Sequence, residues 1–445
     1  MQQLNRRTIK DLSIPADVAV GNLAKLPEKV LQFGEGNFLR AFVDWHFQAL
    51  NTAGYFNGNI VVVQPIAQGM GGMINDQDGL YTCLLRGIKD GRPIEKREII
   101  TNISRVLKAD TQWAELVAVA ESNELEYVVS NTTEAGIVFD AEDTATMTPP
   151  HSYPAKLALL LYARYLKFRG AADKGLVIIP CELIEQNGQT LRQVILRLID
   201  AWQLPVAFAA WVREHNTFVS TLVDRVVTGY PKDEIENIWQ ALGYRDNLVV
   251  AGELYHLWVL EAPAALAERL PFARIGLNVI WTDDQRKYRE RKVRILNGAH
   301  TTGVPVAYQY GLDTVRQMME DSITGKFVTQ AIYEEIIPSM DDEPAALQEL
   351  ASEVINRFKN PYIKHYLLSI MLNSSSKYKA RVLPSLLAYQ QKYSKLPLRL
   401  VFALAGLLNI YALGELRDNV LCCQRSGEAF RMQDDLATLH KFTAI

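Results

Sequence analysis

Three side chains in one stretch of the sequence have the chemistry needed to interconvert an alcohol and a carbonyl: Lys292, Asn297 and His300. On an α-helix, with steps of about 100° per residue, Asn297 would lie about 140° and His300 about 80° round from Lys292. The amine can exchange the hydroxyl proton, the carboxamide can donate to an oxyanion, and the imidazole can orient the substrate or the lysine. The spacing therefore predicts that one cleft uses all three as catalytic residues.

A lysine that works as a base near neutrality needs help, because its pKa is ordinarily about 10.4 and only burial or cationic neighbours lower it. Arg289, Arg291 and Arg294 are candidate cations. The alternative is a solvated basic helix that enters a core without any catalytic role. The pair Tyr288-x-x-x-Lys292 also occurs in short-chain dehydrogenases, but here it lies much too late in the chain for that class.

A glycine turn lies near the start of the chain. Residues 29–33 predict a short buried strand, Gly34-Glu-Gly36 follows, and residues 41–50 have helical periodicity. Such a turn between strand and helix lets backbone N–H groups receive a pyrophosphate. The third glycine of G-x-G-x-x-G is absent, with Leu39 in its place, and similar turns also occur without a ligand.

Further apolar runs at residues 59–63, 127–130 and 175–179 predict buried parallel strands. Polar residues follow them, including Gln64 and Asn131. Ligands of an open parallel sheet collect at the carboxyl ends of its strands, although a plain loop or a helix cap would also explain Asn131. The pattern predicts an α/β fold with a Rossmann-like dinucleotide-binding domain.

The second half of the chain reads differently. Helical patterns dominate residues 191–270, residues 271–281 predict a last extended piece, and residues 282–284 can cap the helix that carries Lys292. We therefore predict an NAD-binding domain at residues 1–284 and a mostly α-helical catalytic and substrate domain at residues 285–445. Its further helices are expected at residues 314–320, 327–337, 345–358, 363–372, 382–393 and 398–411.

The composition excludes several classes of protein. A net charge of −3 over 445 residues predicts no nucleic acid and no membrane surface as a partner. The first residues lack an apolar signal region, and the four cysteines form no CxxC pair, so we expect no export signal and a cytoplasmic location. The seven histidines include no HExxH motif, so no metal is expected.

Lys292-x-x-x-x-Asn297-x-x-His300 resembles the signature of the mannitol dehydrogenase family, the polyol-specific long-chain dehydrogenases. The first turn of that family, Gly-x-Gly-x-Phe-x-Arg, is matched by Gly34, Gly36, Phe38 and Arg40. The resemblance implies NAD as cofactor and hydride transfer with lysine as general acid and base. The cofactor-binding residues that it implies are Val30, Leu31, Gln32, Phe33, Gly34, Glu35, Gly36, Asn37, Phe38, Leu39, Arg40, Ala41 and Asn131.

Preference for NAD over NADP is a separate prediction. Gln64 stands where an acid often meets the ribose, so charge exclusion of a 2′-phosphate is lost. Residues 65–68 contain no arginine that would attract that phosphate. We therefore expect NAD.

Two positions depart from the family pattern. The family commonly has an asparagine that holds the oxyanion where this chain has Leu183, and Asn187 is a candidate replacement in substrate binding, although a turn-forming Asn-Gly is the alternative. Lys377 replaces an arginine of a serine-rich loop, and His365 stands where an aspartate is usual.

Within the family, residues 32–44 and 360–365 are most similar to the hexuronate branch. This implies a small-molecule substrate, a keto-uronate that is interconverted with an aldonate. Such a substrate needs a cation for its carboxylate, and Lys377, Lys379 and Arg381 are candidates, with Lys377 foremost. For Lys379 and Arg381 simple solvation is the favoured alternative, and Lys359 or Lys364 is another candidate contact. Fructuronate reductase and mannitol or arabinitol dehydrogenase are rival enzymes. A sugar-acid or nucleotide sensor on the same fold is a non-catalytic rival, which would need neither Lys292 nor Asn297.

Overall fold

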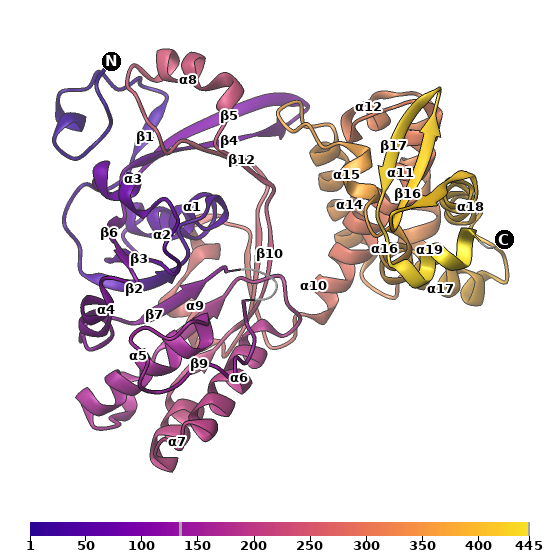
Figure 1. The fold of residues 1–445 in the computed structure, drawn as a ribbon. Helices are drawn as coiled ribbons and strands as arrows, with labels where there is room; N and C mark the ends of the chain where they lie inside the picture. The colour runs from indigo at the N-terminus through magenta and orange to yellow at the C-terminus, as the bar shows by residue number, and fades with distance from the viewer. Residues whose placement is uncertain (133–135, 444–445) are drawn as a thin grey trace. The chain divides into compact units, whose positions relative to one another are not determined.

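The computed structural model describes residues 1–132 and 136–443. The chain divides into two compact units (Figure 1). Unit 1 comprises Met1–Arg86 and Glu95–Gln285, and unit 2 comprises Gly87–Ile94 and Arg286–Ile445. Among the described residues, no helix combines the length and the apolar character that crossing a membrane requires.

A six-stranded parallel sheet forms the centre of unit 1, in the order β6-β3-β2-β7-β8-β9. Its middle strands are buried on both faces, as the continuous runs of valine, leucine and isoleucine predict. The strand order reverses on either side of β2, so the carboxyl end of β2 lies at the topological switch point. The strands are β2 (Glu28–Phe33), β3 (Asn59–Gln64), β6 (Ile103–Lys108), β7 (Tyr127–Ser130), β8 (Val177–Pro180) and β9 (Thr217–Phe218).

Alternate residues of each strand face opposite sides of this sheet. Leu31 and Phe33 pack with the apolar faces of α4, α5, α6 and α7, whereas Val30 packs with α2 and the buried Trp258. The Rossmann-like fold predicted from the apolar strands is confirmed. The helices are α1 (Asn37–Ala41), α2 (Val43–Thr52), α3 (Gly71–Asp76), α4 (Trp113–Ala120), α5 (Tyr153–Phe168), α6 (Asn187–Ala201) and α7 (Val206–His215).

The helical pattern predicted for residues 191–270 is wrong between residues 217 and 261. Several short strands lie there, together with α8 (Ile235–Leu242), and α9 (Ala265–Arg269) follows. They build a three-stranded sheet, β10-β13-β14, and part of a five-stranded sheet, β1-β5-β4-β12-β11. The bounds are β1 (Val18–Val20), β4 (Tyr81–Lys89), β5 (Arg92–Ile100), β10 (Ser220–Asp224), β11 (Val227–Gly229), β12 (Val250–Glu253), β13 (Leu257–Glu261) and β14 (Val279–Thr282).

Unit 2 is built mainly of helices around one apolar core. A single helical run at its start consists of α10 (Arg286–Arg291), the π-helical turn η5 (Lys292–Asn297) and α11 (Gly298–Tyr310). Each helix predicted at residues 314–411 has a counterpart, and α16 is an additional one. They are α12 (Val315–Glu320), α13 (Thr324–Gln330) with the π-helical η6 (Ala331–Ile336), α14 (Pro344–Phe358), α15 (Leu367–Met371), α16 (Ser374–Arg381), α17 (Leu383–Tyr393) and α18 (Leu398–Leu413).

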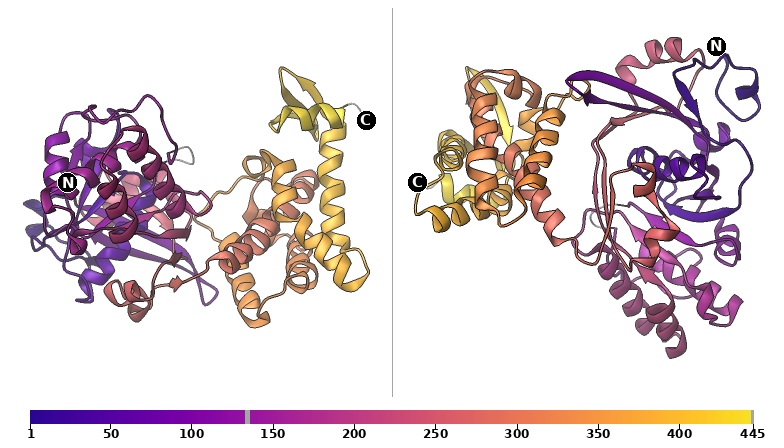
Figure 2. Two further views of the ribbon diagram at one scale, coloured as in Figure 1. Left: turned by 90° about the horizontal axis from the view of Figure 1, so that it is seen from below. Right: turned by 180° about the vertical axis from the view of Figure 1, so that it is seen from behind.

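Unit 2 also contains an antiparallel sheet that the sequence analysis did not predict. Its strands are β15 (Glu415–Arg417), β16 (Val420–Arg425) and β17 (Glu428–Met432), and α19 (Leu436–Thr443) follows. Figure 2 shows these strands in yellow beside α18, which packs against β16. The expectation of a mostly helical domain therefore holds, with this small sheet as an addition.

Candidate active site

The turn after β2 has the geometry of a nucleotide-binding turn. Gly34 has a φ of +113°, which favours glycine, and a Cβ there would lie 3.1 Å from the carbonyl oxygen of Asn131. The N–H of Gly34 donates to Val63 at 3.0 Å, which ties the turn to β3. Gly36 caps α1, and a Cβ on Gly36 would meet nothing within 4 Å. The turn thus presents an open side at the start of a helix.

The predicted cofactor-binding residues divide into a buried and an accessible set. Most of them form the strand and the helix core beneath the turn. Arg40 is wholly buried, and its guanidinium donates to Leu248 O at 2.6 Å and Asn37 Oδ1 at 2.7 Å. Arg40 therefore fixes the start of α1 from below. The accessible or partly accessible residues are Glu35, Gly36, Asn37 and Phe38, and the buried ones are Val30, Leu31, Gln32, Phe33, Gly34, Leu39, Arg40 and Ala41.

The ends of β7 and β8 are fastened to each other. The amide of Asn131 donates to Cys181 O at 2.7 Å, and the buried carboxylate of Glu182 accepts from the hydroxyl of Ser130 at 3.1 Å and the N–H of Thr132 at 3.0 Å. Burial raises the pKa of Glu182, and these hydrogen bonds oppose that shift. The sequence analysis did not single out Glu182, whose carboxylate links the two strand ends.

Asn187 lies in a fully buried network at the start of α6. Its Nδ2 donates to Pro180 O and Glu182 O, both at 3.0 Å, and its Oδ1 accepts from the N–H of Thr221 at 2.8 Å. A substrate would reach this amide only after those bonds break. Leu183, where the family places an asparagine, is 65% exposed.

Gln64, at the end of β3, holds the loop that follows it. Its Nε2 donates to Ile66 O at 2.8 Å and Ala67 O at 3.0 Å, and its Oε1 accepts from the N–H of Gly71 at 3.0 Å. The side chain is therefore engaged within its own loop. Ala67 and Gln68 are exposed at the tip of that loop.

In unit 2, Lys292 and Asn297 are the first and last residues of the π-helical turn η5. The prediction of about 140° between them assumed an α-helix and is wrong for this stretch. A π-helix bonds residue i to residue i+5, so Asn297 lies about one full turn beyond Lys292, on the same side of the helix. The angle round the helix axis between the amine and the amide is thus smaller than the predicted angle of about 140°. Single π-helical turns are frequent at functional sites.

The arginines beside Lys292 have anionic or hydroxyl partners. Arg291 forms a two-pronged ion pair with Asp342, with both N–O distances 2.6 Å, and Arg294 pairs with Glu290 at 2.7 Å. Arg294 also donates to the hydroxyl of Ser385 at 2.8 Å. Because their charges are compensated, Arg291 and Arg294 anchor the helix rather than act on Lys292 through unbalanced charge.

His300, on the first turns of α11, is packed against other rings. Its imidazole stacks on Phe358 with 4.0 Å between ring centroids and meets His365 edge-on at 5.1 Å. Its Nε2 is buried and has no hydrogen-bond partner among the described residues. Burial, followed by the charge of His365, holds the pKa of His300 well below its usual value, so the ring is neutral at physiological pH.

Lys377, Lys379 and Arg381 lie on α16, which packs against both η5 and α11. The ammonium of Lys377 donates to Ile370 O at 2.8 Å, whereas Lys379 is exposed. A Cβ on Gly298 would lie 3.2 Å from the carbonyl oxygen of Arg381. Arg381 thus lies against the residue that follows Asn297.

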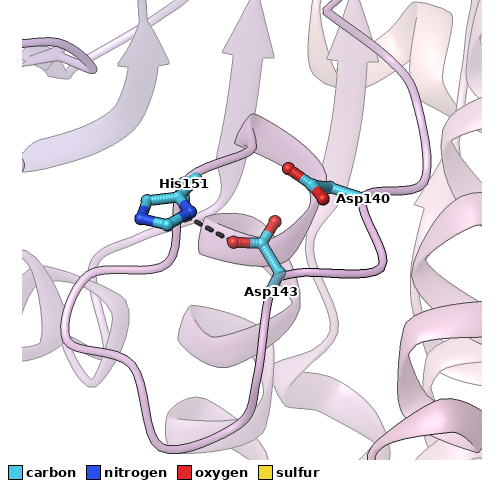
Figure 3. Close-up of side chains that lie close together, drawn as sticks. All are labelled: Asp140, Asp143 and His151. Atoms are coloured by element: carbon cyan, nitrogen blue, oxygen red, sulfur yellow. Dashed lines mark hydrogen bonds between the residues drawn. The ribbon is translucent and has the colours of Figure 1, made fainter.

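One group of three potential metal ligands occurs among the described residues: Asp140, Asp143 and His151, whose ligand atoms lie within 4.8 Å of one another. Figure 3 shows Asp143 accepting a hydrogen bond from His151. Asp143 accepts the backbone N–H groups of His151 at 2.5 Å and Ser152 at 3.0 Å, just before α5. These bonds explain the group as a support of the helix start.

A Rossmann-type sheet with a glycine turn at its switch point, and a helix that carries a lysine and an amide on one turn, together define the dehydrogenase class of oxidoreductases. The chain belongs to the mannitol dehydrogenase family. The family model of the mannitol dehydrogenase Rossmann domain matches residues 28–274, and that of the mannitol dehydrogenase C-terminal domain matches residues 284–441.

Its relatives include proteins named altronate oxidoreductase. The one from Enterobacter sp. (strain 638) is 47% identical over 94% of this chain and 85% of its own length. The one from Yersinia enterocolitica is 45% identical over 100% of this chain and 88% of its own length. The one from Klebsiella pneumoniae (strain 342) is 48% identical over 95% of this chain and 86% of its own length.

Two solved structures have the same fold. D-sorbitol dehydrogenase in substrate-free form has a TM-score of 0.80 at 21% identity, over 93% of this chain and 86% of that one. Pseudomonas fluorescens mannitol 2-dehydrogenase, in a ternary complex with NAD and D-mannitol, has a TM-score of 0.73 at 21% identity, over 99% of this chain and 89% of that one.

Proposed function

We propose that this protein is an NAD-dependent oxidoreductase that interconverts D-altronate and D-tagaturonate. The observation that carries the proposal is the identity of 44–48% to altronate oxidoreductases over 94–100% of the chain. The lysine, amide and imidazole that alcohol–carbonyl interconversion requires are present in unit 2. The small-molecule substrate is thus a hexuronate or its aldonate.

In this proposal residues 1–284 bind NAD and residues 285–445 carry the catalytic groups. The turn at Gly34 and Gly36 supports NAD binding, because Gly36 is exposed at the start of α1 and the first N–H groups of a helix have no acceptor within the helix. Glu35, Asn37 and Phe38 would contact the nucleotide, and the buried residues beneath them would hold the turn in shape. When bound, the nicotinamide donates or accepts the hydride.

The chain's own groups handle the proton and the charge. Lys292 protonates the alkoxide during reduction of the ketone and removes the hydroxyl proton during oxidation of the alcohol. Asn297, on the same side of η5, donates an N–H to the oxygen on which negative charge develops. His300 is neutral and has a buried Nε2 without a partner among the described residues, so it can orient a substrate hydroxyl without adding charge.

Asn131 and Asn187 have supporting roles in this scheme. Both are engaged with backbone carbonyls at the strand ends, so they would shape the edge of the sheet rather than hold the oxyanion. A cytoplasmic location is part of the proposal, since Cys83, Cys181, Cys422 and Cys423 are all free thiols.

The test is oxidation of NADH by the purified protein with D-tagaturonate, D-fructuronate, D-fructose and D-arabinulose, followed by the loss of nicotinamide absorbance. We expect D-tagaturonate to have the highest kcat/KM. D-fructuronate or a neutral ketose as the best substrate would assign the protein to another member of the family. Binding of NADH without turnover of any of these substrates would favour a sensor.

A further inference from the structure

Basic groups surround the imidazole of His300 in unit 2. The charges of His365, Arg357, Arg381 and Lys377 all act to lower the pKa of His300. These groups come from α14, from the loop before α15 and from α16, so they converge from separate parts of the chain. Like charges gathered in a partly buried place repel one another, and such an arrangement is stable only when an anion or a hydrogen-bond acceptor balances it.

Lys377 already has partners. Its ammonium donates to Ile370 O at 2.8 Å, and the charge of Asp434 acts on it favourably. Asp434 in turn accepts the N–H and the hydroxyl of Ser375, at 2.9 and 2.6 Å, so it is held beside the first turn of α16. This lysine is therefore largely satisfied within the protein itself.

Arg381 differs from Lys377 in this respect. Its guanidinium is partly buried, and it has no hydrogen bond or ion pair with any of residues 1–132 and 136–443. The side chain of His365 likewise has no hydrogen bond within these ranges, and its ring meets the ring of His300 edge-on. The guanidinium of Arg381 and the imidazole of His365 thus have no hydrogen-bond acceptor among the described residues. The buried Nε2 of the neighbouring His300 has no hydrogen-bond partner there either.

A carboxylate is the acceptor that fits this set. A guanidinium presents a planar fork that binds both oxygens of a carboxylate, and an imidazole N–H can donate to the same group. The backbone carbonyl oxygen of Arg381 lies 3.2 Å from the place of a Cβ on Gly298, the residue after Asn297, so the end of α16 that carries Arg381 lies against the proposed catalytic turn. A polyol or a neutral ketose offers no anion to this set, whereas a hexuronate does.

We propose that Arg381, together with His365, binds the carboxylate of the hexuronate substrate and so selects sugar acids over neutral sugars. This inference rests on the proposed function and refines it. The sequence favoured Lys377 as the cation that binds the carboxylate, whereas the contacts within unit 2 favour Arg381. Lys377 then adds a second positive charge near the carboxylate. Its ammonium is held in place by the hydrogen bond to Ile370 O and by the charge of Asp434.

The test compares Arg381→Met and Arg381→Lys with Lys379→Met, a control that removes an exposed cation from the same helix. D-tagaturonate is paired with D-tagatose, which has the same carbonyl and no carboxylate. Loss of a charged hydrogen bond should raise the KM of Arg381→Met for D-tagaturonate by about 10- to 100-fold and leave its kcat/KM for D-tagatose unchanged. Arg381→Lys should recover part of the loss, and Lys379→Met should match the parent.

Two outcomes would overturn the inference. A KM for D-tagaturonate that does not change in Arg381→Met would show that the guanidinium does not bind the carboxylate. Equal losses on both substrates together with a lower melting temperature would show that Arg381 supports the fold. Removal of a partly buried cation without a partner should instead leave the melting temperature equal or higher.

A binding measurement separates failure of this inference from failure of the proposed function. Calorimetric titration with D-altronate and with altritol, in the presence of NAD, reports the preference for the acid without any need for turnover. If the parent does not reduce D-tagaturonate but binds D-altronate more tightly than altritol, and Arg381→Met abolishes that preference, the proposed function is wrong and the carboxylate site stands. If the parent shows no preference, the carboxylate site is wrong.

Discussion

Lys292 and Asn297 lie at the two ends of one π-helical turn, so the amine and the amide share a side of the helix that an α-helical path would have separated by about 140°. In the proposed function, the wide turn therefore allows two residues five positions apart to serve one reaction centre. The helix is anchored by the ion pair of Arg291 with Asp342 and by the hydrogen bonds of Arg294 to the hydroxyls of Ser385 and Ser339.

Lys292→Met should lower kcat by about 10²- to 10⁴-fold, the range expected for a positioned proton-transfer group. NADH binding should persist, because the proposed cofactor residues all lie in unit 1. Stopped-flow turnover and fluorescence titration of NADH measure the two effects. Lys287→Met, an exposed change on the preceding helical turn, should behave as the parent. Nearly unchanged turnover in Lys292→Met would remove the lysine from the mechanism.

The glycines of the first turn should respond differently to alanine. Gly34→Ala forces a positive φ on a residue with a Cβ and brings that atom to 3.1 Å from Asn131 O, which should cost about 1–3 kcal/mol of unfolding free energy. Gly36→Ala has a φ of −67° and open space, so its stability should match that of the parent while its KM for NADH rises. Denaturant unfolding measures the stability of both variants, and NADH saturation curves measure their KM. Equal stability of the two variants would contradict the role assigned to Gly34.

NADH should be a better substrate than NADPH for the parent, since the loop after β3 offers no cation. Ala67→Arg places a guanidinium at the exposed tip of that loop and should raise kcat/KM for NADPH about tenfold or more, the effect of one charged hydrogen bond. Gln64 is left intact because it holds the loop. Comparable efficiencies of the parent with both cofactors would show that the preference is wrong.

His256 predicts how the stability of unit 1 depends on pH. Burial, with the charge of Arg225 second, lowers its pKa from 6.5 to about 3, and its Nε2 accepts the N–H of Asn278 at 2.9 Å, which requires a neutral ring. Above pH 6.5 the ring is neutral in both folded and unfolded chains. Below it the unfolded chain binds a proton that the folded chain does not, so stability falls as the pH drops from 6.5 towards 3.

His256→Gln should reduce this slope by up to about 1.4 kcal/mol per pH unit, the value for one proton. Urea unfolding at a series of pH values measures it. The buried His46, whose pKa is also held well below its usual value, accounts for part of the slope that persists. A variant of His256 with the parental slope would contradict the assignment.

The sequence predicted the parts of the fold in which local pattern and tertiary context agree. The apolar strands β2, β3 and β7 are such parts, since burial on both faces demands continuous valine, leucine and isoleucine. Strand β10 was missed because its partner is β13, where Ser220 pairs with Glu261, and such long-range pairing leaves no local signal. The turn η5 was missed because the expected angle already assumed an α-helix.

The strands after α18 could have been found. Asp418 and Asn419, and then Ser426 and Gly427, all have positive φ and form the tight connections of β15, β16 and β17. Two-residue turns of this composition between alternating apolar residues are typical of hairpins. The sequence could not show which of the predicted cofactor-binding residues are accessible and which are buried. Arg40, for example, is buried because its guanidinium donates to Leu248 O, far along the chain.

The attachment of α16 to Asp434 has a consequence for biosynthesis. Asn373 and Ser375, at the start of that helix, are fastened to Gln433 and Asp434, which are made long after the helix itself. The ribosome must therefore have synthesised the chain as far as Asp434 before Lys377 and Arg381 gain their final support. A nascent chain that has already folded the parallel sheet of unit 1 would still lack the finished form of the proposed carboxylate site, so we expect cofactor binding to be acquired earlier in translation than substrate selection.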